Sequence, residues 1–147
     1  MKIKFKKKRL YAHLILGLVW IVLGIAILIF GVGLGWSNYG YSIIGILYIG
    51  HYLHDVTNQY LTIENGTIKK NGLYGFGKKI NLNDINWIKK FAGDYTLKTQ
   101  TRELKIDTSL IDNQSLVELL RILGSLNLPP EKTPFSDKGY NSSLSQN

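Results

Sequence analysis

Between Leu10 and His54 the chain has no Lys, Arg, Asp or Glu, and most of its positions are apolar. The first part of this stretch, residues 10–34, predicts a helix that can cross a hydrocarbon core of about 30 Å, because each helical residue adds about 1.5 Å. Glycines and a short polar turn follow, and residues 37–55 predict a second, shorter helix. The pattern therefore predicts a transmembrane helical hairpin over residues 10–56.

From Tyr60 onward the pattern changes to short segments in which apolar and polar positions alternate, which is typical of half-buried strands. Asn65-Gly66 lies between two such segments and is a turn of the kind that joins antiparallel strands. We expect about six strands in an antiparallel meander. Their apolar positions are Leu61 and Ile63, Ile68, Ile80 and Leu82, Ile85 and Trp87, Tyr95 and Leu97, and Leu104 and Ile106.

A single amphipathic helix is predicted after the strands, with Asp112 placed to cap its N-terminus. Its leucines recur at i, i+3, i+4 and i+7 on one helical face, at Leu116, Leu119, Leu120 and Leu123. Pro129 and Pro130 prevent continuation of the helix, and the polar residues 128–147 are predicted to be a disordered tail. The expected fold is thus a membrane α-helical hairpin plus an α+β soluble domain over residues 57–127.

The charge distribution orients this hairpin. Six Lys and Arg residues precede Leu10 and make residues 1–9 a basic segment. Basic flanks stay on the cytoplasmic side of a membrane, so we expect a multi-pass protein with both termini in the cytoplasm. A cleaved signal peptide is the rival interpretation, but the apolar run is longer than a typical signal-peptide core and no clean cleavage site follows it.

The basic segment also predicts a partner. Lys6, Lys7, Lys8 and Arg9 adjoin the membrane, where each cation contributes about 1 kcal/mol of attraction to an anionic leaflet. A plain topology signal is the alternative interpretation. The rest of the chain carries twelve basic residues against ten acidic ones, so the net charge of +8 does not favour nucleic-acid binding. The chain has no Cys, which excludes disulfides and thiolate chemistry.

Gly17, Gly24 and Gly31 repeat every seven residues and are expected to share one face of the first helix. Small residues on one face allow another helix backbone to approach closely. The second helix of the hairpin is the nearest candidate for that partner. A homo-oligomer, or the helix of another membrane protein, is the alternative partner.

The three histidines of the chain, His13, His51 and His54, are expected at the same end of an antiparallel hairpin. His51 and His54 are spaced i, i+3, which can present two imidazoles to a metal ion or a haem. The bland interpretation is that all three are interfacial side chains with their polar tips in water. We favour that interpretation, because no further ligand motif accompanies them, and we expect no resident metal or cofactor.

The strands followed by one C-terminal helix, directly after two membrane helices, resemble the bacterial pleckstrin-homology-like (PH-like) domain proteins. The resemblance covers residues 60–126 and is carried by Tyr60-Leu61-Thr62-Ile63-Glu64-Asn65-Gly66-Thr67-Ile68 and by Ile80-Asn81-Leu82-Asn83-Asp84-Ile85. It implies a partly open seven-stranded β-barrel capped by the helix, where this chain has about six recognisable strands. It also implies a binding or assembly role at the bacterial inner membrane, for a family of unknown function.

Three lysine pairs, Lys69-Lys70, Lys78-Lys79 and Lys89-Lys90, form a basic edge that could rest on anionic headgroups, with the first two pairs as the candidate binding residues. Neighbouring strand residues point to opposite faces, so at most half of these lysines can join one patch. A solvated strand surface is the alternative interpretation.

The sequence contains no catalytic constellation, so we expect a binding or scaffolding module and no enzyme. Its expected ligand is an anionic lipid headgroup or a protein partner. The alternatives are a small membrane subunit that binds metal or haem through His13, His51 and His54, and an accessory subunit of a membrane complex.

Overall fold

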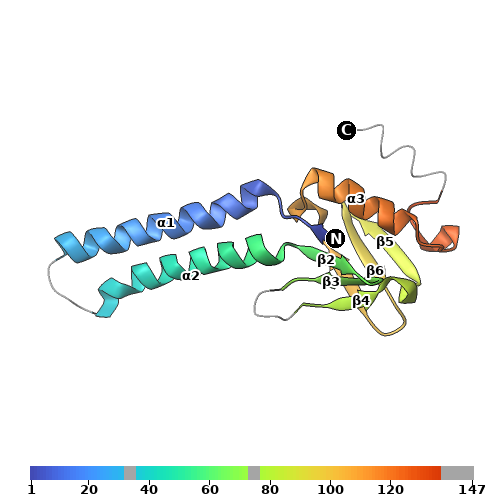
Figure 1. Cartoon of the computed structure of the whole chain (residues 1–147), viewed down its shortest axis with the longest axis horizontal. Coiled ribbons are helices and arrows are strands. Elements are labelled where there is room, and N and C mark those ends of the chain that lie inside the picture. Colours follow the sequence, from blue (N-terminus) through green and yellow to red (C-terminus); the bar gives the residue numbers. More distant parts are fainter. Residues whose placement is uncertain (32–35, 73–76, 137–147) are drawn as a thin grey trace. The chain divides into compact units, whose positions relative to one another are not determined.

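A computed structural model describes residues 1–31, 36–72 and 77–136 of the chain (Figure 1). The chain divides into two compact units. One unit is Phe5–Gln59, and the other combines Met1–Lys4 with the chain from Tyr60 onward. The first four residues therefore belong to the same unit as the domain that follows the helices.

The first unit is a hairpin of two helices, α1 (Lys7–Phe30) and α2 (Trp36–Asn58). The side chains on its outer surface are largely apolar, and Val22, Ile29 and Ile46 are 64%, 67% and 62% exposed. A contiguous apolar surface of this kind marks a helix that faces lipid or another protein. The predicted hairpin is present, and its membrane environment remains an expectation.

The helix boundaries differ from the predicted ones. Helix α1 begins three residues before Leu10, because Lys and Arg are good helix formers even though they are charged. It ends at Phe30, since Gly31 adopts an extended backbone conformation (φ −73°, ψ 140°). Residues 32–34 of the predicted first helix lie outside the described part of the chain. Helix α2 continues past residue 55 to Asn58.

Glycines bring the two helices into backbone contact. Gly17 and Gly24 are buried on α1, and a Cβ at Gly17 would lie 3.1 Å from the carbonyl oxygen of Gly45 on α2. A Cβ at Gly24 would lie 2.9 Å from the backbone nitrogen of Ser42. This face of α1 is therefore filled by α2 within the hairpin. Gly31 lies beyond the end of α1 and takes no part in the contact.

The second unit contains a four-stranded antiparallel sheet in the order β1-β2-β3-β4. Strands β2 (Leu61–Glu64), β3 (Thr67–Lys70) and β4 (Lys79–Asn81) lie in the predicted region. Asn65 and Gly66 have positive φ angles of 48° and 69°, which is the backbone of the predicted hairpin turn. Strand β1 (Lys2–Ile3) comes from the N-terminus and pairs with β2, where the sequence predicted only a basic segment.

A separate three-stranded antiparallel sheet has the order β5-β6-β7. Its strands are β5 (Trp87–Phe91), β6 (Asp94–Lys98) and β7 (Glu103–Ile106). The predicted single meander is therefore divided between β4 and β5, where the short 3-10 helix η2 (Leu82–Asp84) interrupts the pairing. The two sheets do not close into one barrel, and the fold class is α+β.

Helix α3 (Asn113–Gly124) follows the sheets, and the predicted N-cap is confirmed, because the Asp112 carboxylate accepts a hydrogen bond from the Ser115 backbone N–H. Leu119 and Leu123 are fully buried. The helix also holds the N-terminal strand, since the Ser115 hydroxyl accepts a hydrogen bond from the Lys4 N–H at 3.2 Å. The core of this unit is formed by apolar side chains from both sheets and α3, among them Ile3, Leu61, Ile68, Ile88, Leu97, Leu104, Ile106 and Ile111.

The chain after α3 is ordered for longer than predicted. The 3-10 helix η4 (Pro130–Lys132) follows, and the Phe135 ring stacks on Tyr95 with centroids 5.6 Å apart. The prediction of disorder from residue 128 is therefore wrong for its first part, because an aromatic side chain anchors the segment to the core. Residues 137–147 lie outside the described part of the chain.

Candidate functional site

A row of lysines crosses the outer face of the four-stranded sheet. Lys2 pairs with Thr62, Thr62 with Lys69, and Lys69 with Lys79, so the four side chains share one face. The opposite face carries the row Ile63, Ile68 and Ile80, which is buried. Alternation along short strands thus buries the isoleucines and places Lys2, Lys69 and Lys79 together on the surface.

Lys70 and Lys78, the other lysines of the first two predicted pairs, do not join this row. Lys70 pairs with Leu61 on the core side of the pleat, and its ammonium donates a hydrogen bond to the Lys105 carbonyl at 2.9 Å. The same ammonium lies 5.1 Å from the centre of the Tyr60 ring. Lys78 is exposed and precedes β4. Lys89 and Lys90 of the third predicted pair lie on β5 of the other sheet. Only one lysine from each of the first two pairs therefore contributes to the patch, within the limit that the pleat sets.

The predicted basic cluster Lys6, Lys7, Lys8 and Arg9 belongs to the helical unit. Lys6 is the N-cap residue of α1, and Lys7 and Lys8 are exposed in its first turn. The Arg9 guanidinium lies over the Phe5 ring, 4.5 Å from its centre. These four cations therefore flank the apolar part of α1.

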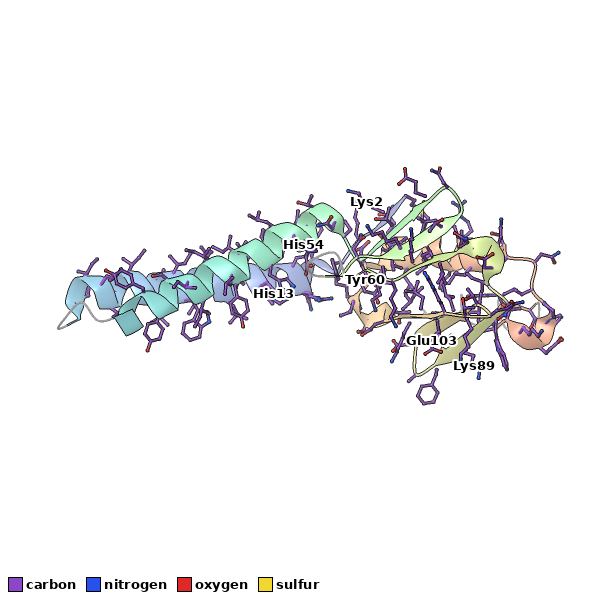
Figure 2. All side chains as sticks on the ribbon, turned by 90° about the horizontal axis from the view of Figure 1, so that it is seen from below. Lys2, His13, His54, Tyr60, Lys89 and Glu103 are labelled. Atoms are coloured by element: carbon purple, nitrogen blue, oxygen red, sulfur yellow. The ribbon has the colours of Figure 1, made fainter. Side chains whose placement is uncertain are left out.

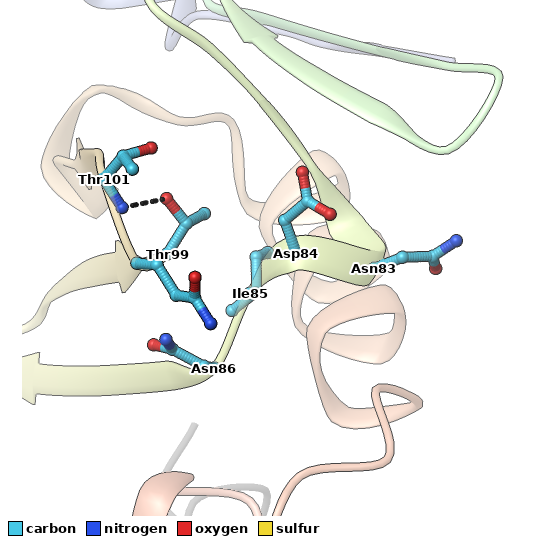
Figure 3. Close-up of a pocket in the computed structure, with 7 residues that line it drawn as sticks. Asn83, Asp84, Ile85, Asn86, Thr99 and Thr101 are labelled. Atoms are coloured by element: carbon cyan, nitrogen blue, oxygen red, sulfur yellow. Dashed lines mark hydrogen bonds between the residues drawn. The ribbon is translucent and has the colours of Figure 1, made fainter.

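An open polar groove adjoins the lysine row at the edge of β4, and Figure 3 draws its part farther from the lysines, lined by residues 83–86 and 99–101. One part has a volume of about 370 Å³ and is lined by Thr67, Lys79, Ile80, Asn81, Asp84, Thr99, Thr101 and Arg102. A neighbouring part of about 440 Å³ shares Asp84, Thr99 and Thr101. Figure 3 shows Asp84 and Ile85 on one wall and Thr99 and Thr101 on the other. The part beside Lys79 and Arg102 combines two cations with threonine hydroxyls, the Asn81 amide and the Asp84 carboxylate.

A tight turn fixes the β6–β7 side of the groove. The Thr99 hydroxyl accepts hydrogen bonds from the backbone N–H groups of Arg102 at 3.0 Å and Thr101 at 3.4 Å. The Thr99 N–H donates to the Arg102 carbonyl at 2.8 Å. These bonds hold the Arg102 backbone at the groove. The sequence pattern marked this segment only as a turn and gave no signal for an arginine beside Lys79.

Two cations of the lysine row, Lys69 and Lys79, differ from Lys98 and Lys105 on the other sheet, which have acidic partners. On the three-stranded sheet Lys98 pairs with Glu103 at 3.2 Å and Lys105 with Asp94 at 3.0 Å. The hydrogen bond from Lys105 to Asp94 raises the pKa of that ammonium above its ordinary value. Among the described residues, Lys69, Lys79 and Arg102 have no carboxylate within 4.0 Å. Their charge is therefore available to an external anion.

The three-stranded sheet exposes aromatic side chains that the sequence pattern did not mark as a site. Trp87, Lys89 and Phe91 share the outer face of β5, and Phe91 is 83% exposed. The Lys89 ammonium lies 4.3 Å from the centre of the Trp87 ring. Figure 2 shows Lys2 and Lys89 on opposite sides of this unit. The lysine row and this aromatic strip therefore cannot rest on one flat surface together.

Within the helical unit, the structure brings two of the three histidines together and adds a carboxylate. The rings of His13 and His51 are stacked with centroids 4.6 Å apart, and His51 Nε2 lies 3.3 Å from Asp55 Oδ2. His54 Nδ1 lies 3.6 Å from the other Asp55 oxygen. The sequence places Asp55 beside His51 and His54 on α2, and the approach of His13 depends on how α1 packs against α2.

No protein-family model, curated protein or solved structure matches the chain. Among the described residues, α1 is the helix with the length and composition needed to cross a membrane. The geometry and charge of the lysine row and groove are therefore the basis for assigning a ligand.

Proposed function

We propose that the chain is a binding module anchored in the bacterial inner membrane, with a PH-like domain that binds phosphate-bearing anionic lipid headgroups at the cytoplasmic face. Its role is tethering and binding, without catalysis. The hairpin keeps the domain beside the leaflet at a high effective concentration, so weak headgroup contacts are sufficient for occupancy.

Connectivity supports two membrane crossings. Strand β1 precedes α1 and β2 follows α2, and these two strands are paired in one sheet. Paired strands lie on the same side of a membrane, so the chain between them crosses it an even number of times. Since α1 has the length and composition of a transmembrane helix, α2 is the second crossing. The 23 residues of α2 are long enough to cross the hydrocarbon core of a bilayer.

The strand count supports the PH-like assignment. Strand β1 adds a seventh strand to the six that follow Tyr60, and the strands form sheets of four and three. Helix α3 comes after the last strand, as the resemblance implies. The helical hairpin is then an insertion between the first and second strands of the domain.

The lysine row beside the groove is the observation that supports an anionic ligand. Lys69 and Lys79 are neighbours across β3 and β4, and Arg102 lies with Lys79 in the groove lining. The threonine hydroxyls and asparagine amides of the same lining can hydrogen-bond phosphate and glycerol oxygens. Lys69, Lys79 and Arg102 have no carboxylate within 4.0 Å among the described residues, so these three cations favour a phosphodiester headgroup over a neutral one, and the Asp84 carboxylate in the same lining is the one group that opposes an anion there.

Titration with short-chain lipids tests this proposal. Full-length protein in mild detergent is titrated with short-chain phosphatidylglycerol and with short-chain phosphatidylcholine, and binding is measured by calorimetry. We expect preference for phosphatidylglycerol, and a loss of roughly 100-fold in the triple variant Lys69→Gln, Lys79→Gln, Arg102→Gln, because each cation contributes about 1 kcal/mol. The matched control removes three exposed cations elsewhere in the domain, with Lys89→Gln, Lys90→Gln and Arg121→Gln.

Equal affinity for the two lipids would contradict the proposal. An equal loss in the control variant would also contradict it, because the attraction would then come from net charge and no site would be involved.

A further inference from the structure

We infer that His13, His51 and Asp55 form a binding site for one divalent transition-metal ion, with Zn²⁺ as the best-matched ion. The site lies within the helical hairpin and is independent of the proposed headgroup binding. One ligand atom from each of the three residues can be chosen so that all three atoms lie within 4.8 Å of one another. Two ligands come from α2, spaced i, i+4 on one face, and the third comes from α1.

The buried carboxylate is the observation that points to a cation. Asp55 is 6% exposed, and its Oδ2 atom has no hydrogen-bond partner among the described residues. The described groups that pair with it are the imidazoles of His51 and His54, and no Lys or Arg lies within 4.0 Å. A buried carboxylate without a compensating cation is costly, and a bound divalent ion removes that cost.

The unpaired histidine nitrogen adds a second observation. His13 Nδ1 is buried and has no hydrogen-bond partner among the described residues. A buried ring nitrogen usually has a partner, since leaving it without one costs about 1–3 kcal/mol. Metal coordination satisfies this atom and the Asp55 Oδ2 atom, which lacks a hydrogen bond, at the same time.

The donor set selects the class of ion. Two imidazoles and one carboxylate suit zinc, cobalt, nickel or ferrous iron, whereas calcium and magnesium prefer all-oxygen sites. Tetrahedral bonds of about 2.1 Å place ligand atoms about 3.4 Å apart. The His51–Asp55 separation of 3.3 Å already fits this geometry, whereas the His13 ring, which is stacked on His51, must turn and move closer before its nitrogen can reach the same ion. Three protein ligands leave a fourth position for water.

Two further residues fit this assignment. His54 Nδ1 lies 3.6 Å from Asp55 Oδ1 and, like His13 Nδ1, is buried without a hydrogen bond among the described residues; a small movement would let it hydrogen-bond and orient the carboxylate without coordinating the ion. Tyr48 lies beside the His13 ring, with centroids 6.1 Å apart, and limits its rotation. A bound ion would join α1 to α2 and stabilise the hairpin by mass action.

The test uses the full-length chain with a C-terminal tag that contains no histidine. The protein is purified in mild detergent, stripped with a chelator, and titrated with Co²⁺ and Zn²⁺. We expect one ion per chain, a visible d–d absorption of four-coordinate Co²⁺, and a higher unfolding temperature with Zn²⁺. His13→Gln, His51→Gln and Asp55→Asn should each abolish the Co²⁺ absorption.

His54→Gln is the matched control, since it removes an imidazole beside the site that is not a ligand. It should keep one ion per chain, with affinity weakened by about 10–100-fold. The wild-type titration decides the proposal even where a variant fails to fold. Absence of Co²⁺ absorption in wild-type protein would overturn it, and so would metal binding that persists in Asp55→Asn or is lost in His54→Gln.

Discussion

The backbone N–H of Tyr60 donates a hydrogen bond to the carbonyl oxygen of Ile3 at 3.0 Å. The two residues lie on either side of the helical hairpin in the sequence, and both are buried in the same unit. The segment Met1–Lys4 therefore belongs to the sheet domain. A fragment that starts at residue 60 therefore lacks the edge strand β1 and the buried Ile3 side chain.

Replacement of Ile3 tests that role. Ile3 is fully buried, and deletion of a buried isoleucine side chain to alanine costs about 2–5 kcal/mol. We expect Ile3→Ala to lower the free energy of unfolding of the full-length chain by this amount, measured by chemical denaturation in detergent. Lys4→Ala is the control, because that side chain is exposed and should cost less than about 0.5 kcal/mol. Equal stability of the two variants would contradict the role of β1 in the core.

Cysteine labelling tests the two-crossing topology, and the absence of native Cys makes the experiment simple. A cysteine at Gly40, near the start of α2, should react with a membrane-impermeant maleimide in intact spheroplasts. A cysteine at the exposed Gln100 in the sheet domain should react only after permeabilisation. Labelling of both positions from the same side would refute the transmembrane hairpin.

The contact between α1 and α2 can be tested with one methyl group. A Cβ at Gly24 would lie 2.9 Å from the Ser42 backbone nitrogen, which is too close for either helix to remain in place. Gly24→Ala should cost about 1–3 kcal/mol, seen as a lower midpoint of helix unfolding by circular dichroism. Gly50→Ala is the control, because a Cβ added there would meet no atom within 4 Å and alanine favours a helix by about 0.5–1 kcal/mol. A stable Gly24→Ala protein would show that the helices do not pack through this face.

The tyrosine beneath the C-terminal segment gives a pH prediction. Burial raises the pKa of the Tyr95 hydroxyl above its ordinary value of 10.0. Above pH 10 the unfolded chain releases this proton while the folded chain retains it, so the free energy of unfolding falls as the pH rises toward the folded-state pKa. Tyr95→Phe should resemble the wild type at pH 7 and lose less stability above pH 10. Parallel denaturation curves for both proteins across this range would contradict it.

Local sequence signals predicted local structure well. Asn65-Gly66 specified a hairpin turn because its residues tolerate positive φ, and Asp112 specified a helix start because its carboxylate caps a free N–H. The residues Lys2-Ile3-Lys4-Phe5 also alternate in the manner of a strand, and Ile3 and Phe5 are both buried. The high density of lysines in this segment predicts a basic flank of the membrane helix, and a strand of two residues is too short for alternation to predict it.

The candidate sites depend on contacts between segments distant in sequence, which explains what could not be predicted. Lys69 and Lys79 become neighbours only through the pairing of β3 with β4. Arg102 reaches the same groove from the β6–β7 turn. Asp55 and His13 come together through close helix packing. The periodicity of a single helix or strand does not predict which residues of other elements lie close to it. Those contacts can be predicted only once the strand register and the helix packing are known.

The insertion of the hairpin between β1 and β2 has a consequence for biosynthesis. The ribosome delivers β1 first, and its partner β2 emerges only after both helices. The domain therefore reaches its complete sheet only when the hairpin has left the ribosome and its two ends have met, and the long loop that this closure spans makes it a slow folding step. Until then the buried face of β2 lacks Ile3, so an unfinished chain presents an open sheet edge for chaperones and proteases to recognise.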